Sequence, residues 1–200
     1  MVLFIVGRSG SGKSYLAKQI VREILPYRKV VVINNNPEYV NEISGMVPFV
    51  VDKPHKYDWN KVISSELNPH IELLVNSDEI NGELDEISEA ILTRGNIFLV
   101  IDEARLYYPQ YKHSRGVEKL INTGRKFKVD TMFVSQIAVL VNRTVDSQVT
   151  FIICFQTTRK AEVERMRLYF GDDADQLSRL NNHRFMICDF LSGDTGIGRL

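Results

Sequence analysis

The sequence has few cysteines, no excess charge and no long apolar run, and each absence excludes a class of protein. Its two cysteines, Cys154 and Cys188, each lie in an apolar run, which favours buried thiols over a disulfide scaffold or a metal centre. Lys plus Arg and Asp plus Glu both total 25, so only a locally basic groove could attract nucleic acid. No apolar stretch approaches the roughly 20 residues that span a bilayer, and none resembles a signal peptide. We therefore expect a cytoplasmic protein without membrane contacts.

Short apolar segments alternate with segments of helical periodicity along the chain. This pattern is typical of an α/β fold, a mostly parallel central sheet flanked by helices. We expect strands at 2–6, 29–34, 47–51, 71–75, 97–101, 129–135 and 148–155, and helices near 16–25, 59–66, 80–91, 114–124, 163–170 and 173–180. The run FMICDF (185–190) and a glycine-rich ending predict a C-terminal β-hairpin. Because no repeat or low-complexity linker is present, residues 1–200 are expected to form a single domain.

Eight residues after the first expected strand match the phosphate-loop pattern G-x-x-x-x-G-K-[ST]. They are Gly7, Arg8, Ser9, Gly10, Ser11, Gly12, Lys13 and Ser14, and Tyr15 follows them in an amphipathic helix. Glycines let the backbone wrap around phosphates, while the N–H groups and the helix N-terminus attract anions. We expect these nine residues to bind ATP, with Lys13 on the β- and γ-phosphates and Ser14 on Mg²⁺. A turn that merely starts a helix is the alternative, but the strand–loop–helix context argues against it.

Two acids follow the most apolar expected strand, IFLVI (97–101). In a parallel sheet the carboxyl ends of strands face the ligand crevice. Asp102 is therefore expected near the magnesium ion, through water, and Glu103 is expected to polarise an attacking water. A solvated acidic helix start is the alternative. The pair favours hydrolysis over phosphate transfer to a small molecule, although some kinases also carry acids at this position.

Gln136 and Arg125 lie at the two ends of one expected strand. An amide at the carboxyl end can donate to a γ-phosphate oxygen and accept from water, so Gln136 is a candidate sensor. A polar strand end that faces solvent is its alternative. Arg125 lies at the far end and could reach only the site of a neighbouring subunit, where an arginine would stabilise the charge that develops during phosphoryl transfer. A solvated basic helix end explains Arg125 about equally well.

Four segments together resemble the FtsK–HerA superfamily of DNA-translocating ATPases. They are GRSGSGKS (7–14), IFLVIDEA (97–104), INTGRKFKVDTMFVSQ (121–136) and LSRLNNHRFMICDF (177–190). Within it the chain is similar to the genome-packaging ATPases of icosahedral viruses with double-jelly-roll capsids, especially archaeal viruses.

The resemblance implies a RecA-like P-loop NTPase, a hexameric ring and ATP-driven movement of double-stranded DNA into a capsid. Capsid proteins are then possible partners, and the protein would act in the host cytoplasm or at a virion vertex. The resemblance also implies Gln136 as the sensor and Arg125 as an arginine finger acting in trans, with Arg159 as a second candidate finger.

Basic residues in expected loops are candidates for contact with DNA. They are Lys53, His55, Lys56, Lys112, His113, Arg115, Lys126 and Lys128. In a ring, a few such residues per subunit would neutralise many phosphates without a basic monomer. Ordinary solvated loops are the alternative for each of them. We interpret the interleaved Tyr57, Tyr107, Tyr108 and Tyr111 as packing residues, because bases stack on aromatics only in single strands.

Two other functions remain open from the sequence. A nucleotide-type small-molecule kinase would need an arginine-bearing lid, and the segment 156–171 supplies Arg159, Lys160, Arg165 and Arg167. Gln136 and the acid pair have no necessary role in such an enzyme. A non-catalytic switch or assembly factor that binds ATP as a scaffold is the third possibility.

Overall fold

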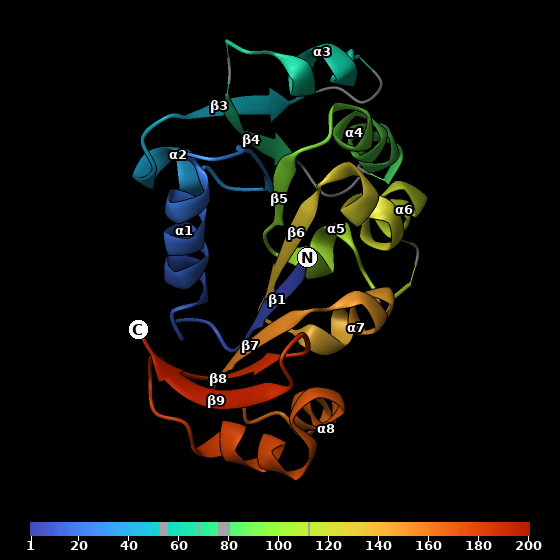
Figure 1. Cartoon of the computed structure of the whole chain (residues 1–200). Helices are drawn as coiled ribbons and strands as arrows, with labels where there is room; N and C mark the ends of the chain where they lie inside the picture. The colour runs from blue at the N-terminus through green and yellow to red at the C-terminus, as the bar shows by residue number, and fades with distance from the viewer. Residues whose placement is uncertain (53–55, 68, 76–80, 112) are drawn as a thin grey trace.

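The computed structural model describes residues 1–52, 56–67, 69–75, 81–111 and 113–200, which form a nine-stranded sheet flanked by helices (Figure 1). The strand order is β3-β4-β2-β5-β6-β1-β7-β8-β9. The parallel strands are β1 (Val2–Val6), β2 (Lys29–Asn34), β3 (Met46–Val51), β4 (His70–Val75), β5 (Ile97–Ile101), β6 (Asp130–Ser135) and β7 (Phe151–Phe155). The expected α/β fold is confirmed.

The central strands are apolar on both faces because helices cover both faces. On one face lie α1 (Lys13–Ile24) and α2 (Glu38–Glu42), packed on side chains such as Ile5 and Val100. The other face carries α3 (Trp59–Ser64), α4 (Asn81–Arg94), α5 (Ala104–Tyr107), α6 (Arg115–Thr123), α7 (Thr144–Gln148) and α8 (Lys160–Phe170). Among the described residues, no helix is long and apolar enough to cross a bilayer.

The chain ends in an antiparallel hairpin, as the sequence predicts. Strands β8 (Arg184–Asp189) and β9 (Asp194–Arg199) extend the sheet beyond β7. A Cβ atom at Gly198 would lie 2.4 Å from the Phe185 ring, so any larger residue at this position would force the Phe185 side chain to shift. At the other edge of the sheet, β3 carries the exposed Pro48, which has no N–H group to donate.

Three local expectations differ from the structure. The strand predicted at 148–155 starts only at Phe151, because residues 144–148 form α7 and bury Val145 in the core. The helix predicted at 173–180 is the 3₁₀ helix η4 (Gly171–Arg179), and the short helices α2 and α5 lie where only loops were expected. Two further 3₁₀ turns, η2 (Gly124–Phe127) and η3 (Ala138–Leu140), flank β6. Tertiary packing overrides the local pattern at these positions.

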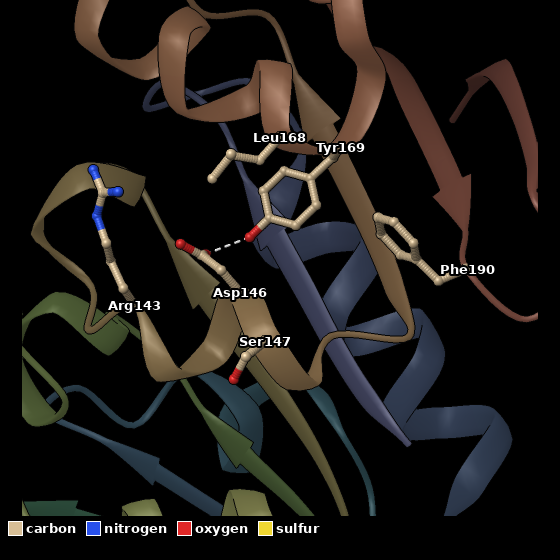
Figure 2. A pocket seen from close by; sticks show the side chains of 6 residues that line it. All are labelled: Arg143, Asp146, Ser147, Leu168, Tyr169 and Phe190. Carbon is tan, nitrogen blue, oxygen red and sulfur yellow. Dashed lines mark hydrogen bonds between the residues drawn. The ribbon is translucent and has the colours of Figure 1, made fainter.

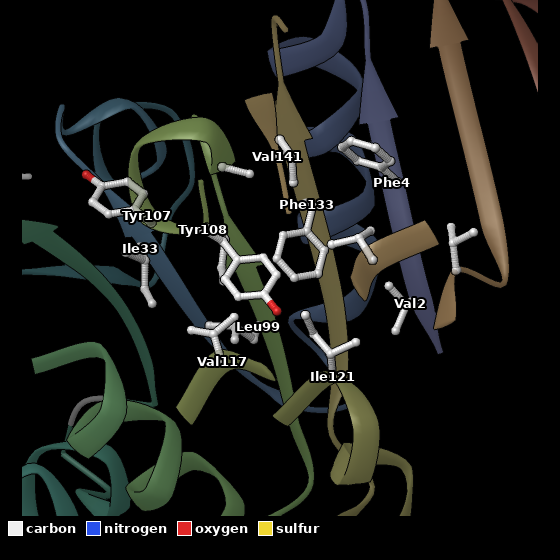
Figure 3. Close-up of a cluster of buried hydrophobic side chains, with 14 of the residues drawn as sticks. Val2, Phe4, Ile33, Leu99, Tyr107, Tyr108, Val117, Ile121, Phe133 and Val141 are labelled. Carbon is white, nitrogen blue, oxygen red and sulfur yellow. The ribbon is translucent and has the colours of Figure 1, made fainter. Parts of the chain in front are cut away.

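Phe133, in the middle of β6, lies at the centre of the larger core cluster. It is fully buried, and its ring centroid lies 6.0 Å from that of Tyr108 (Figure 3). Tyr107 and Tyr108 are buried as well, which confirms the interpretation of these two residues as packing residues. The cluster fixes β6 against the segment that follows β5.

We expect Phe133→Ala to lower the free energy of unfolding by about 3–5 kcal/mol, because it leaves a cavity in a close-packed core. Phe127→Ala is the matched control, since Phe127 is 45% exposed, and it should cost less than about 1 kcal/mol. Urea unfolding followed by circular dichroism measures both values. Equal losses for the two variants would contradict the central position of Phe133.

Candidate functional site

The phosphate loop, the acid pair and Gln136 meet at one edge of the sheet. Strands β5, β6 and β1 are adjacent and parallel, with Ile101 opposite Phe133 and Ser135 opposite Val6. Because the carboxyl ends of parallel strands lie at the same edge, the segments that follow these strands converge there. The phosphate loop, the acid pair and Gln136 therefore lie near each other, as the sequence predicts.

The loop between β1 and α1 has the backbone shape that phosphate binding requires. Gly7 and Gly12 have φ angles of 146° and 107°, which residues with a side chain rarely adopt. A Cβ atom at Gly7 would lie 2.6 Å from the Cβ atom of Phe155. The Ser11 hydroxyl is buried and has no hydrogen-bond partner within the described part of the chain. An anion in the loop would supply that partner, so the loop fits a bound phosphate.

Lys13 lies at the mouth of this loop. Its side chain is buried, and Nζ donates a hydrogen bond of 2.9 Å to the carbonyl oxygen of Arg8. Burial lowers the pKa of Lys13, whereas the nearby charges of Glu103 and Asp102 oppose the shift. Ser14 is half-buried next to it, and the side chain of Tyr15 is 56% exposed. The ammonium group is thus held close to both acids.

Asp102 is buried, and both of its carboxylate oxygens accept hydrogen bonds. Oδ2 accepts from the Tyr39 hydroxyl at 2.9 Å, and Oδ1 accepts from the backbone N–H of Glu103 at 2.8 Å. Burial raises the pKa of Asp102 to about 6, although both hydrogen bonds act in the opposite direction. Together with the Ser14 hydroxyl, this carboxylate is the type of oxygen ligand that Mg²⁺ prefers.

A second buried acid supports the contact between Tyr39 and Asp102. Glu72 of β4 is fully buried and accepts hydrogen bonds from the N–H groups of Tyr39 at 3.2 Å and Val40 at 2.8 Å. The side-chain amide of Asn34 donates to the same carboxylate at 3.2 Å. Glu72 therefore anchors α2, and α2 positions the Tyr39 hydroxyl. The sequence analysis missed both residues, although an acid inside the apolar run IELLV was a usable signal.

Glu103 accepts hydrogen bonds from two side chains at once. Its Oε1 accepts from Gln136 Nε2 at 2.6 Å, and its Oε2 accepts from Arg105 Nε at 3.3 Å. The backbone of Glu103 has φ 49° and ψ 47°, a left-handed conformation that costs of order 1 kcal/mol and is concentrated at functional sites. Sequence reasoning missed Arg105, which lies only two residues along the chain. Hydrogen bonds from Gln136 and Arg105 thus fix the position of the Glu103 carboxylate.

The two candidate arginine fingers lie at opposite ends of the parallel strands. Arg125 is exposed in η2, before the first residue of β6, so it lies far from the phosphate loop of its own chain. Arg159 is exposed just before α8, near Gln156, whose carbonyl oxygen accepts a hydrogen bond of 3.2 Å from the N–H of Arg8. Arg159 thus lies at the same end of the strands as the phosphate loop, whereas Arg125 lies at the other end.

The candidate DNA-contacting residues are scattered. Lys53, His55 and Lys112 lie outside the described residues. Lys56, Arg115, Lys126 and Lys128 are exposed. His113 is less available, because its ring lies 3.2 Å from Glu118 Oε2 and 2.8 Å from the Asn142 side-chain amide.

A hollow elsewhere on the molecule does not belong to this site. Figure 2 shows it between α7, the end of α8 and Phe190, with the Tyr169 hydroxyl directed at Asp146. Asp189, which precedes Phe190, pairs with Phe151 at the start of β7. The hollow therefore lies at the end of β7 that is remote from the phosphate loop.

Comparison with solved structures places the fold among known proteins. The chain superimposes with a TM-score of 0.79 on the genome packaging NTPase B204 of Sulfolobus turreted icosahedral virus 2 in complex with AMPPCP; the two are 19% identical, and the match covers 99% of this chain and 96% of that one. The DNA-packaging ATPase B204 of Sulfolobus turreted icosahedral virus gives a TM-score of 0.75 at 20% identity, covering 99% and 96%. VirB4 of Thermoanaerobacter pseudethanolicus gives 0.73 at 11% identity, covering 99% and 88%.

No protein-family model and no curated protein matches the chain. At these identities the structural likeness shows the fold alone. That fold is the one expected from the motifs, a P-loop ATPase fold with an added C-terminal hairpin, so the resemblance to packaging ATPases is confirmed at the level of structure.

The buried carboxyl of Asp102 gives a pH-dependent prediction. A carboxyl with a raised pKa destabilises the folded state as the pH rises from its unfolded value to its folded value. Since burial raises the pKa of Asp102 from 3.8 to about 6, Asp102→Asn should gain about 3 kcal/mol relative to the wild type over that interval. Urea unfolding at several pH values in magnesium-free buffer measures the difference.

The exposed Asp173 provides the control for this experiment. Asp173→Asn makes the same change of side chain at the surface, so it measures how an Asp-to-Asn substitution alone alters the free energy of unfolding. If the difference between Asp102→Asn and the wild type stayed constant from about pH 4 to pH 7, the carboxyl would not be desolvated as described.

Proposed function

We propose that this chain is an ATP-hydrolysing motor subunit that moves double-stranded DNA, most plausibly a viral genome into a capsid. One observation carries the proposal: Glu103, beside the phosphate loop, shares its carboxylate between Gln136 and Arg105. An acid held by an amide at the γ-phosphate position is suited to orient a water molecule. The fold shared with structures described as packaging NTPases supports the same function.

Each residue of the site has a distinct role in this proposal. N–H groups of the phosphate loop, other than that of Arg8, which donates to Gln156, would bind the phosphates. Lys13 would exchange its bond with the Arg8 carbonyl for the β- and γ-phosphate oxygens. Ser14 and Asp102 would hold Mg²⁺, Asp102 through water, and the metal would neutralise phosphate charge. Glu103 accepts hydrogen bonds in the absence of substrate and would take the proton of the attacking water. Gln136 would then report whether the γ-phosphate is present.

A small-molecule kinase is the second candidate, and the surroundings of its expected lid argue against it. Arg165 is buried and donates to backbone carbonyl oxygens of residues 138 and 141. Arg167 is paired with Glu164, Asp172 and Asp175. Two of the four basic residues expected in a lid are thus engaged elsewhere, so the segment is poorly suited to close over phosphates.

We predict that the wild-type protein hydrolyses ATP, that linear double-stranded DNA stimulates the rate, and that Glu103→Gln lowers kcat by about 10²–10⁴-fold. The loss follows from removal of the base, so affinity for a non-hydrolysable ATP analogue should change little. Phosphate release and analogue titration measure the two quantities. Glu89→Gln, which changes an exposed acid, is the control.

Two outcomes would contradict this assignment. Phosphorylation of a nucleoside or nucleoside monophosphate from ATP would favour the kinase. Slow hydrolysis whose rate changes neither with added DNA nor with Glu103→Gln would favour a scaffold that only binds ATP.

We further propose that subunits pack head to tail in a ring of six, and that residues 1–200 form one motor unit. The exposed Arg125 lies at the sheet edge opposite the phosphate loop, so head-to-tail packing would bring it to a neighbour's γ-phosphate. Arg159 is the second candidate finger. The exposed Lys56, Arg115, Lys126 and Lys128 are candidate DNA contacts, and capsid proteins are candidate partners in the host cytoplasm or at the virion vertex.

A mixing experiment tests the shared site. Lys13→Ala lacks a working phosphate loop but keeps Arg125, whereas Arg125→Ala has the reverse defect. Each variant alone should be nearly inactive, and a mixture should recover part of the activity because some interfaces combine the two intact halves. No recovery, with both variants folded and assembled, would rule out Arg125 as a trans finger, and the same mixture with Arg159→Ala would test the alternative.

A further inference from the structure

The loop that follows Gln136, residues 137–141, is held by two charged side chains of α8. Glu162 accepts hydrogen bonds from the backbone N–H groups of Ala138 at 2.8 Å and Val139 at 3.3 Å. Arg165, one turn along the same helix, donates from Nη1 to the carbonyl oxygens of Ala138 and Val141, the latter at 2.8 Å. One helix turn thus binds both the donors and the acceptors of this short loop.

Packing alone does not account for these two residues. Glu162 is 4% exposed and Arg165 is 3% exposed, and burying such charges usually costs as much as their interactions return. Burial raises the pKa of Glu162, while the two N–H groups oppose the shift. Apolar side chains could fill the same space at lower cost but could not bind the buried N–H and carbonyl groups of this loop, such as those of Ala138.

Two further contacts hold Arg165 in place. Its Nη2 donates to Asp146 Oδ1 at 2.6 Å, and Asp146 also accepts from the Tyr169 hydroxyl (Figure 2). The guanidinium carbon lies 5.7 Å from the centre of the Phe4 ring in β1, a distance suited to a cation–π contact. Glu162 and Arg165 therefore connect residues 137–141 to α7, α8 and β1, the strand that leads into the phosphate loop.

The loop is separated from the catalytic acid by a short path. Only Ile137 lies between Gln136 and the N–H group that Glu162 binds, and Gln136 Nε2 lies 2.6 Å from Glu103 Oε1. The Ser135 hydroxyl accepts from the N–H of Ile137 at 3.2 Å. A shift of the loop by a few tenths of an ångström would therefore change the contact between the amide and the acid.

On the premise that the chain hydrolyses ATP, we propose that Glu162 and Arg165 are positioning residues. By holding the 137–141 loop, they keep the Gln136 amide within hydrogen-bond distance of Glu103. They touch neither the phosphate loop nor the acids, so they act on the reaction only through Gln136.

A double-mutant cycle tests this role. Glu162→Gln keeps the shape and one acceptor but loses the charge, and we expect kcat to fall about 10-fold with less than a 2-fold change in affinity for a non-hydrolysable ATP analogue. In a Gln136→Ala background the same change should have no further effect, since residues that act as a unit are non-additive. Glu164→Gln is the matched control, because its side chain on the same helix is 72% exposed.

Hydrogen exchange at the Ala138 and Val139 amides provides a measurement that does not need activity. Both amides should exchange faster in Glu162→Gln than in the wild type, and Glu164→Gln should leave them unchanged. Arg165→Lys, which keeps a positive charge, is the second variant if Glu162→Gln does not fold, and it enters the same cycle.

The results separate this inference from the proposed function. A wild-type protein that hydrolyses no ATP would contradict the proposed function itself. In an active wild type, the inference is overturned if Glu162→Gln keeps full kcat despite faster exchange, or if its loss adds fully to that of Gln136→Ala.

Discussion

The parallel register of β5, β6 and β1 is the constraint on which the rest of the site depends. These strands are buried and apolar on both faces, so polar chemistry can occur only where they end. Their common direction places the phosphate loop, Asp102, Glu103 and Gln136 at one edge. A strand in the opposite direction would move any of these groups to the far side of the sheet.

Charged groups near that edge are desolvated, and each one is stabilised by a specific donor. Asp102 depends on Tyr39, and the N–H groups of α2 bind Glu72. Glu162 binds the N–H groups of the loop after Gln136. Because an unpaired buried charge is far more costly than a paired one, these contacts restrict the site to few arrangements. The same restriction makes the position of the reacting groups sensitive to residues outside the site.

The sequence predicted the parts of the site that lie within short segments. The phosphate loop, the acids after β5 and the amide after β6 follow from local patterns and strand direction alone. The partner of Asp102 could not be predicted in this way, because Tyr39 lies 63 positions away in the sequence. Helix α7 was not predicted, since a five-residue helix with one buried side chain, Val145, is too short to show a helical period, and its last residue, Gln148, was assigned to the following strand. The role of Arg125 remains a prediction.

The outer strand of the sheet limits how copies of this chain can meet. Pro48 lies on β3, the outer strand of the sheet, and has no N–H group to donate. Proline on edge strands discourages another strand from pairing there. A second protein surface that met this strand would then contact it through side chains and loops, without extending the sheet by a continuous ladder of backbone hydrogen bonds. Such a contact separates more easily than a shared sheet.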